Sequence, residues 1–137
     1  MSEHPPIPAV PAHVKIEIKD LFNIEKWQNE IDWKPFHPGV EVFRLYGDGV
    51  NGPTAALLRY AKGAKIPSHL HVGYEHILVL SKTQRDEDEV YSEGSLLISP
   101  PKTKHSIVSD EGCIVLAIYE KPVEFFPTPQ NPKPASS

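Results

Sequence analysis

Proline and glycine interrupt this chain of 137 residues so often that it has little room for a long helix. It contains 15 prolines and 8 glycines, and proline is kept out of helix interiors and central strands. Between them lie short runs in which apolar and polar side chains alternate, as they do in a strand with one buried face. Many short strands joined by tight turns are typical of an all-β sandwich or barrel. The sequence therefore predicts an all-β fold.

The alternating runs are spread along most of the chain and are separated by turn-forming residues such as Gly47-Asp48-Gly49 and Asp110-Glu111-Gly112. We expect strands over 14–19, 40–46, 54–61, 77–80, 90–91, 95–99, 105–109 and 113–120, with a last edge piece within 121–126. Residues 33–39, which contain two prolines, are expected to form a loop or an edge segment, and residues 84–89 a charged turn. Asp20 is expected to start one helical turn through Trp27, an apolar plug over an open barrel end.

These segments predict one domain, because 137 residues are enough to bury a core without disulfides or structural metals. We expect a β-barrel domain over residues 14–126. Residues 1–13 are rich in proline and lack apolar periodicity, so we expect a disordered arm there. Residues 127–137 have the composition of a disordered tail.

Composition argues against several classes of partner. The net charge of −4, the pI near 5.9 and the lack of a Lys/Arg cluster argue against nucleic acid. No window approaches the ~18 to 20 apolar residues that cross a bilayer, and the N-terminus lacks the pattern of a signal peptide. The single cysteine, Cys113, cannot form an intramolecular disulfide and is compatible with a reducing compartment. We therefore expect a cytoplasmic protein with neither a nucleic-acid nor a membrane partner.

The strongest chemical signal is a group of histidine and glutamate residues in the middle of the chain. His69, His71 and Glu75 lie within seven residues of one another, and His105 precedes a later β-like run. In an extended segment His69 and His71 project from the same face, and a flexible Gly73 would allow Glu75 to return to the same space. Imidazole and carboxylate ligands suit iron, manganese, nickel, copper or zinc. We expect one divalent metal ion on these four residues inside the barrel, with iron or zinc preferred and manganese or nickel as alternatives.

The spacing of these residues resembles that of a known superfamily. Gly63, five residues, His69-x-His71, three residues and Glu75 resemble the first motif of the cupins. The second motif is similar to Gly94, five residues, Pro100 and then His105. Three positions depart from the family pattern, where Lys82 and Lys102 replace glycine and Ser109 replaces asparagine. All three lie at turn or loop positions, so they affect turn geometry more than metal binding.

Within the superfamily, the stretch from His69 through Val79, the proline pair before His105 and Glu111-Gly112-Cys113 look most like the ChrR-type cupin domain. This resemblance implies an RmlC-like jelly-roll barrel (a double-stranded β-helix) with a metal site of three histidines and one glutamate. It carries over onto His69, His71, Glu75 and His105. Family habit also implies a homodimer. In ChrR the domain belongs to a zinc-dependent anti-sigma factor, but no helical sigma-binding bundle is expected before residue 40.

Three functions are compatible with such a site. With iron, the free coordination positions would suit a dioxygenase-like enzyme acting on a carbonyl or enol compound. With zinc, four ligands can close the shell, as in a ChrR-like sensor or a ligand-binding module without catalysis. In the third, the metal only stabilises the fold. The expected partner is a small-molecule ligand or substrate, and no residue beyond the metal ligands is assigned a catalytic role.

Overall fold

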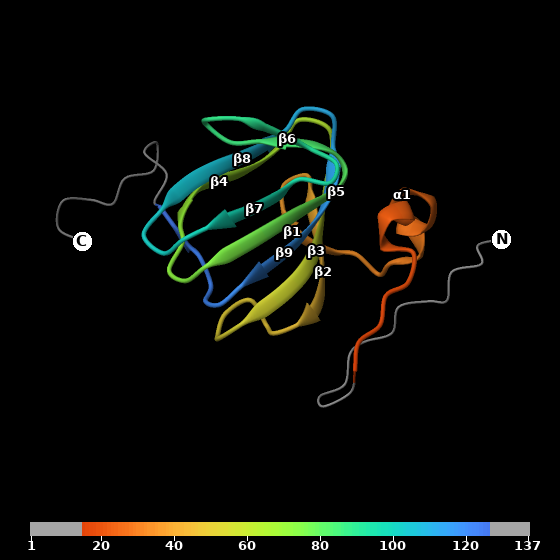
Figure 1. Cartoon of the computed structure of the whole chain (residues 1–137), viewed down its shortest axis with the longest axis horizontal. Coiled ribbons are helices and arrows are strands. Elements are labelled where there is room, and N and C mark those ends of the chain that lie inside the picture. Colours follow the sequence, from red (N-terminus) through yellow and green to blue (C-terminus); the bar gives the residue numbers. More distant parts are fainter. Residues whose placement is uncertain (1–14, 127–137) are drawn as a thin grey trace.

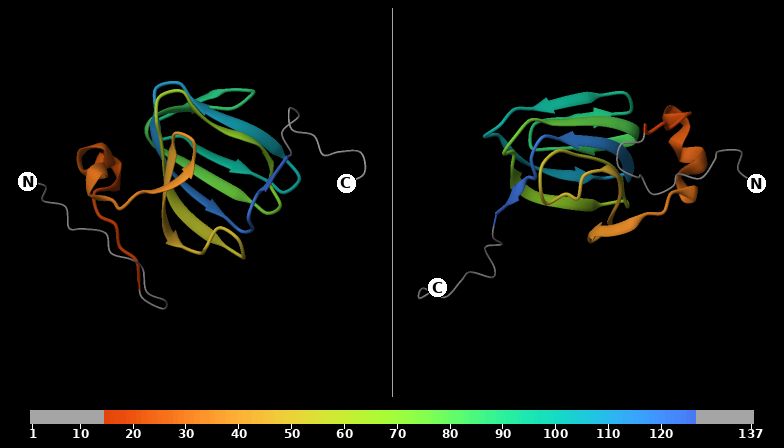
Figure 2. Two further views of the ribbon diagram at one scale, coloured as in Figure 1. Left: turned by 180° about the vertical axis from the view of Figure 1, so that it is seen from behind. Right: turned by 90° about the horizontal axis from the view of Figure 1, so that it is seen from below.

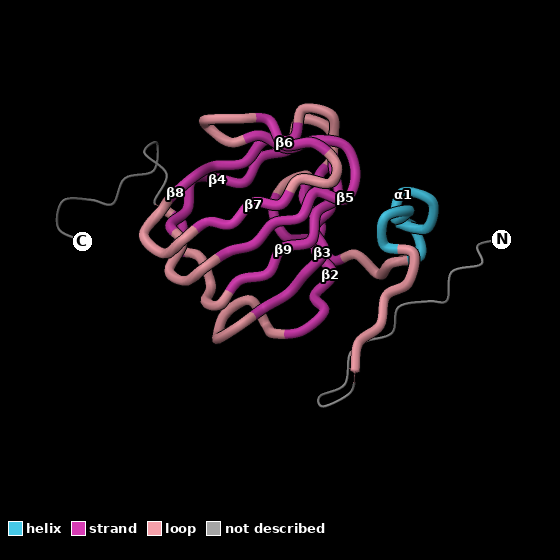
Figure 3. The backbone as a smooth tube through the Cα atoms, viewed as in Figure 1, coloured by secondary structure: helices cyan, strands magenta, loops and turns pink. Residues whose placement is uncertain are grey.

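A computed structural model describes residues 15–126 and confirms the all-β prediction. The predicted disordered arm over 1–13 and tail over 127–137 lie outside the described residues. A helical segment comes first and is followed by strands only (Figures 1 and 3). Within residues 15–126, no helix is long and apolar enough to cross a membrane.

The helical segment consists of three short turns, η1 (Leu21–Asn23), α1 (Ile24–Trp27) and η2 (Gln28–Glu30). The strands are β1 (Lys34–His37), β2 (Val40–Tyr46), β3 (Thr54–Tyr60), β4 (Ala64–Leu70), β5 (Glu75–Arg85), β6 (Val90–Ser92), β7 (Leu96–Ser99), β8 (Lys104–Ser109), β9 (Cys113–Tyr119) and β10 (Glu124–Phe125).

All strand pairs are antiparallel, and the main path through the sheet is β1-β2-β3-β9-β5-β8-β4-β10. The strand β5 joins the two halves of the fold. Its first half pairs with β9 and β7, whereas its second half pairs with β6 and touches β8. A register shift between Val79 and Ser81 lies where the strand passes from one half to the other. The sheet thus curls into a half-barrel that places β4 and β8 opposite β3 and β9 (Figure 2).

Strand alternation divides the apolar residues into two clusters, one on each side of the sheet. The inner cluster fills the barrel and consists of Val40, Tyr60, Ile66, Ile77, Val79, Ile107, Cys113, Val115 and Ala117. The outer cluster lies under the helical segment, where Ile24, Trp27 and Ile31 pack against Leu57, Leu80 and Ile114. The helical segment therefore covers the outer face of β3, β5 and β9.

This placement corrects the prediction of a plug over an open barrel end. Leu57 is buried against the helical segment, while its neighbour Leu58 packs against the inner cluster, so Leu57 faces outward. Asp20 has left-handed backbone geometry and makes no side-chain cap to the helix, and the helical stretch is longer than the single turn expected. The helical segment thus begins without the predicted N-cap.

The strand predicted over 14–19 is also wrong for the residues that the structure describes, since Lys15 to Lys19 form no ladder. Ile16 and Ile18 line an apolar groove with Leu21, Leu45, Tyr46, Ala55, Leu57, Leu116 and Ile118. The alternation in this stretch therefore reflects one-sided contact with the outer face of the sheet and not hydrogen bonding to another strand.

The charged turn begins later than predicted, because β5 continues through Arg85. Gln84 is fully buried, and neither atom of its side-chain amide has a hydrogen-bond partner within the described chain. The turn itself starts at Asp86, whose carboxylate accepts hydrogen bonds from the backbone N–H groups of Asp88 and Glu89. The many charged residues over 84–89 predicted a turn, but Gln84 belongs to β5 and its side chain faces inward.

Candidate metal centre

The four predicted ligands meet at one point inside the barrel. One nitrogen or oxygen atom from each of His69, His71, Glu75 and His105 lies within 4.8 Å of all the others. All four side chains are buried, with exposed fractions of 8% or less. His69 belongs to β4, Glu75 opens β5 and His105 belongs to β8, where it faces His69 directly across the ladder. His71 follows the end of β4.

The loop between β4 and β5 is fixed by its neighbours. The backbone N–H of His71 donates to the Thr103 carbonyl at 2.8 Å, and the N–H of Lys102 donates to the His71 carbonyl at 2.8 Å. A Cβ at Gly73 would lie 2.9 Å from the Cβ of Glu120. Gly73 does not have a positive φ, so left-handed backbone geometry does not explain the glycine. The close approach of Glu120 leaves no room for a Cβ atom and requires glycine at this position.

Hydrogen bonds to Nδ1 of His69 and of His71, on the side of each ring that faces away from the site, determine which ring nitrogen carries the proton. His69 Nδ1 lies 2.9 Å from the Pro67 carbonyl oxygen, which can only accept, so Nδ1 carries a proton. The Thr103 hydroxyl donates to the Pro100 carbonyl at 2.6 Å and must therefore accept from His71 Nδ1 at 2.9 Å. In the neutral rings, Nε2 of both histidines then has a free lone pair directed into the site.

The charges in the site suit a cation. Burial raises the pKa of Glu75, but the neighbouring imidazoles of His105 and His71 outweigh that effect and lower it to about 2, so the carboxylate is ionised. Burial lowers the pKa of His69 and favours its neutral ring. His71 Nε2 lies 3.0 Å from Glu75 Oε1 and His105 Nε2 lies 3.6 Å from it. Without a metal, this lowering of the Glu75 pKa requires a proton on an imidazole nitrogen that faces Glu75, and a cation bound by the neutral rings would replace that proton.

His105 provides an independent test of this fit. Its Nε2 is buried, and it has no hydrogen-bond partner among residues 15–126. A buried polar atom without a partner costs free energy, about 1 to 3 kcal/mol. The donor set of three imidazole nitrogens and one carboxylate oxygen matches iron, zinc and similar divalent ions. The residues present therefore suit a metal ion.

Two spaces adjoin the four residues. A cavity of about 50 Å³ inside the barrel is in contact with His69 and Glu75 and is otherwise lined by Phe36, Val42, Ala56, Leu58, Tyr60, Ile66, Ile77, Ile107, Ala117, Tyr119, Val123 and Phe125. Phe125 packs against His69 with the two rings tilted by 59° and their centres 5.6 Å apart. A wider cleft of about 410 Å³ is in contact with His71 and His105 and carries the acidic residues Asp86, Glu87 and Asp88. The site thus has an apolar inner side and an acidic outer side.

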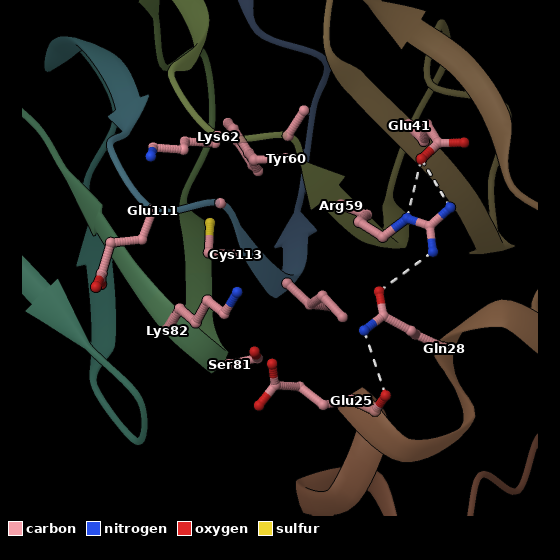
Figure 4. A pocket seen from close by; sticks show the side chains of 13 residues that line it. Glu25, Gln28, Glu41, Arg59, Tyr60, Lys62, Ser81, Lys82, Glu111 and Cys113 are labelled. Atoms are coloured by element: carbon pink, nitrogen blue, oxygen red, sulfur yellow. Dashed lines mark hydrogen bonds and ion pairs between the residues drawn. The ribbon is translucent and has the colours of Figure 1, made fainter.

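A third pocket of about 290 Å³ lies between the helical segment and the barrel and includes none of the four ligands (Figure 4). Arg59 there is paired with Glu41 at 2.8 Å and stacks over Trp33. Cys113 lies in its wall, and burial raises the pKa of its thiol to about 11. The metal cluster found in residues 15–126 does not include Cys113, which behaves as a small buried side chain.

A family model described as the ChrR cupin-like domain matches residues 26–124. The chain belongs to this family. Over 100 residues it is 30% identical to the anti-sigma-E factor ChrR of Cereibacter sphaeroides. The matched region covers 70% of this chain but only 45% of ChrR. The chain therefore spans less than half the length of that relative.

Solved structures agree on the fold. The crystal structure of Rhodobacter sphaeroides SigE in complex with the anti-sigma ChrR matches with a TM-score of 0.63 and 26% identity, covering 76% of this chain and 57% of that one. An acetylacetone dioxygenase from Acinetobacter johnsonii matches with a TM-score of 0.66 and 14% identity, covering 88% and 82% of the two chains. At that identity the second likeness shows the fold alone.

The structure brings together every residue predicted for the metal site and leaves the neighbouring histidine out. His76 faces the outer side of the sheet, opposite Ile98 and Ile118, as the strand alternation predicted. Sequence reasoning missed Thr103 and the Pro67 carbonyl, which orient two of the rings. Nothing in the motif spacing marks them, because one contact is made by a backbone atom and the other by a loop residue 32 positions away.

Proposed function

We propose that this protein binds one divalent metal ion, iron or zinc, through His69, His71, Glu75 and His105. The observation that carries the proposal is the buried Nε2 of His105, which has no hydrogen-bond partner among residues 15–126 and lies 3.6 Å from Glu75 Oε1, in a site where the ring nitrogens of His69 and His71 and an ionised carboxylate converge. Three neutral imidazoles and one carboxylate would leave about one positive charge on a divalent ion. That charge is compatible with burial when the ligands are this close.

We propose further that the centre performs dioxygenase-like chemistry on a small carbonyl or enol compound. The inner cavity is lined by His69 and Glu75, so a molecule in it would lie next to two of the four residues that would hold the ion. When bound, iron would supply the Lewis acidity and redox chemistry that such a reaction needs. The chain itself supplies an apolar wall that excludes water and a carboxylate that stays ionised. A space of about 50 Å³ holds on the order of a few water molecules, so the substrate must be small unless Phe125 moves.

The relationship to ChrR favours a second candidate, a zinc-binding module that senses a ligand or binds a protein without catalysis. ChrR forms a complex with SigE, and the family match covers the cupin-like part of this chain. In that case the four residues would supply all four zinc ligands, and the inner cavity would take no substrate. A protein partner would then replace the small-molecule substrate.

Metal content and oxygen consumption distinguish these candidates. Protein purified without chelator and then reconstituted with Fe²⁺ should consume oxygen when small β-diketones are added, and the His105→Ala variant should not. A zinc-loaded protein that gains thermal stability but shows no turnover with either metal would instead support the non-catalytic module. The matched control is His76→Ala, which should behave as wild type because His76 faces away from the site.

A further inference from the structure

The main path of the barrel sheet has two end strands, β1 and β10, that do not pair with each other in the described chain. Within residues 15–126, β1 pairs with β2 alone and β10 pairs with β4 alone. Side chains bridge the gap instead, because the ring of Phe125 on β10 lies 5.1 Å from the ring of His37 on β1, centre to centre. The same ring lies 5.6 Å from the ring of His69. We call this gap between β1 and β10 the seam.

The seam is also the thinnest wall of the inner cavity. Phe125 lines that cavity together with Phe36 of β1 and Val123, which lies just before β10. Phe125 is at the same time 42% exposed, whereas every other side chain that lines the cavity is buried or half-buried. One aromatic ring therefore separates the inner cavity from solvent at this point.

The strand β10 is held less firmly than the strands that carry most of the cavity wall. It has two residues, both exposed, and it pairs on one side only. The strands β2, β3, β4, β5, β8 and β9 each pair on both sides. Beyond β10, the N–H of Phe126 donates to the Ser68 carbonyl over a long 3.4 Å. Segments with few buried contacts open at a low free-energy cost, so Phe125 can move away from the cavity while the rest of the wall stays in place.

We propose that the seam is the substrate entrance of the metal centre and that Phe125 determines, by size, which molecules pass it. This inference rests on the proposed dioxygenase-like function. The inner cavity of about 50 Å³ has room for the small, metal-binding end of a substrate. Displacement of the Phe125 ring extends this space toward solvent, between Phe36 and Val123. Because aromatic rings line the entrance, the substrate class is a carbonyl or enol compound whose far end is apolar.

The other two spaces are poorer entrances for such a compound. The outer cleft shares no lining residue with the inner cavity, and each of the two spaces touches a different pair of the four metal-site residues. The outer cleft also carries the carboxylates of Asp86, Glu87 and Asp88, which disfavour an anionic enolate. The third pocket shares only Tyr60 with the inner cavity, and this side chain is 4% exposed within the inner cluster. The seam is thus the most direct path to the inner cavity.

Thiol labelling of the full chain tests the entrance without metal, substrate or turnover. Ala56→Cys places a thiol in the wall of the inner cavity, at a position that is 2% exposed. Adding Phe125→Ala should raise the rate at which methyl methanethiosulfonate modifies this thiol at least about tenfold, because no ring then closes the seam. Phe125→Trp should lower the rate. Mass spectrometry follows the native Cys113 in the same sample, and its rate should stay unchanged because it lines the third pocket and not the inner cavity.

Phe126→Ala is the matched control, since Phe126 is 45% exposed beside Phe125 but does not line the inner cavity. It should leave the labelling of Ala56→Cys within about twofold, as expected for a surface substitution. Ile98→Trp, which adds bulk to the outer cleft, should also leave the rate unchanged. An unchanged rate in Phe125→Ala, an equal rise in Phe126→Ala or at Cys113, or a lower rate in Ile98→Trp would each overturn the seam as the entrance.

Reagent size tests the selection that Phe125 imposes. With benzyl methanethiosulfonate in place of the methyl reagent, Phe125→Ala should raise the ratio of the benzyl rate to the methyl rate at least about tenfold, because the lost ring leaves room for the larger group. The same ratio with and without Phe125→Ala would overturn the role of Phe125. These rates do not depend on turnover, so an Fe²⁺-reconstituted protein that consumes no oxygen with β-diketones would refute the proposed function, while the labelling alone decides the entrance.

Discussion

Replacement of Thr103 by valine should weaken metal binding without touching a metal ligand. The hydroxyl of Thr103 accepts from His71 Nδ1 at 2.9 Å while it donates to the Pro100 carbonyl at 2.6 Å. Valine keeps the shape and removes both bonds. His71 Nδ1 would then lose its acceptor in a side chain that is 1% exposed, and the proton would move to Nε2, where it can donate to Glu75 Oε1 at 3.0 Å.

The size of the effect follows from that shift. The Nε2–H form of His71 blocks the lone pair that a metal needs, so affinity should fall about 10- to 100-fold, as for other residues that orient a ligand. A loss of that size corresponds to about 1.4 to 2.8 kcal/mol of binding free energy. It agrees with the cost of about 1 to 3 kcal/mol for one buried donor without a partner.

A competition titration of Zn²⁺ against a chelator of known affinity measures this change. The matched control is Thr103→Ser, which keeps the hydroxyl and should bind within about threefold of wild type. Circular dichroism should show the same fold for all three proteins. Equal zinc affinity in Thr103→Val and wild type would refute the proposed role of Thr103.

Two further predictions concern stability. The pKa of Glu75 is lowered to about 2 in the folded state, so the metal-free protein should be most stable above pH 5 and should lose stability as the pH falls from 4.5 toward 2. Urea titrations at several pH values should show a weaker pH dependence of the unfolding free energy for Glu75→Gln. The same pH dependence in wild type and Glu75→Gln would contradict this role of Glu75. Lys82 and Lys102 have φ of 60° and 73°, a backbone conformation in which a side chain destabilises the fold by about 1 to 2 kcal/mol. Lys82→Gly and Lys102→Gly should therefore each raise the unfolding free energy by about 1 kcal/mol, as measured by urea titration. A decrease would show that the contacts of the lysine side chains outweigh the backbone strain.

The strands could be predicted because their residues satisfy a local rule. Val40–Tyr46 matches the predicted bounds, and Thr54–Tyr60 and Cys113–Tyr119 each end one residue earlier than expected, since period-two alternation needs no knowledge of the partner strand. The edge character expected for residues 33–39 also holds, because the proline-interrupted strand β1 lies at one end of the sheet. The same rule failed at Lys15 to Lys19, where one-sided contact with the sheet produces alternation without a ladder.

The meeting of the four polar residues could be predicted for a similar reason. His69 and Glu75 flank a short turn, and the cupin-like spacing brings His105 across from them. What could not be predicted depends on contacts that spacing does not encode. The proton positions in His69 and His71 are set by Pro67 and Thr103.

The lysines at the two glycine positions of the family pattern show another limit. Lys82 and Lys102 adopt the left-handed geometry that the pattern calls for, even though they lack the residue that adopts it most easily. The surrounding fold therefore imposes this conformation on them. A sequence reading can mark the departure but cannot tell whether the turn is kept, and here it is kept.

The most direct test of the metal centre is metal content by mass spectrometry on tag-free protein purified without chelator. We expect about one iron or zinc ion per chain in the wild type and in His76→Ala, and a sharp loss in His71→Ala, Glu75→Ala and His105→Ala. Equal occupancy in all these variants, or a wild type that holds no metal and takes none up from Fe²⁺ or Zn²⁺, would contradict the assignment of the four residues as ligands.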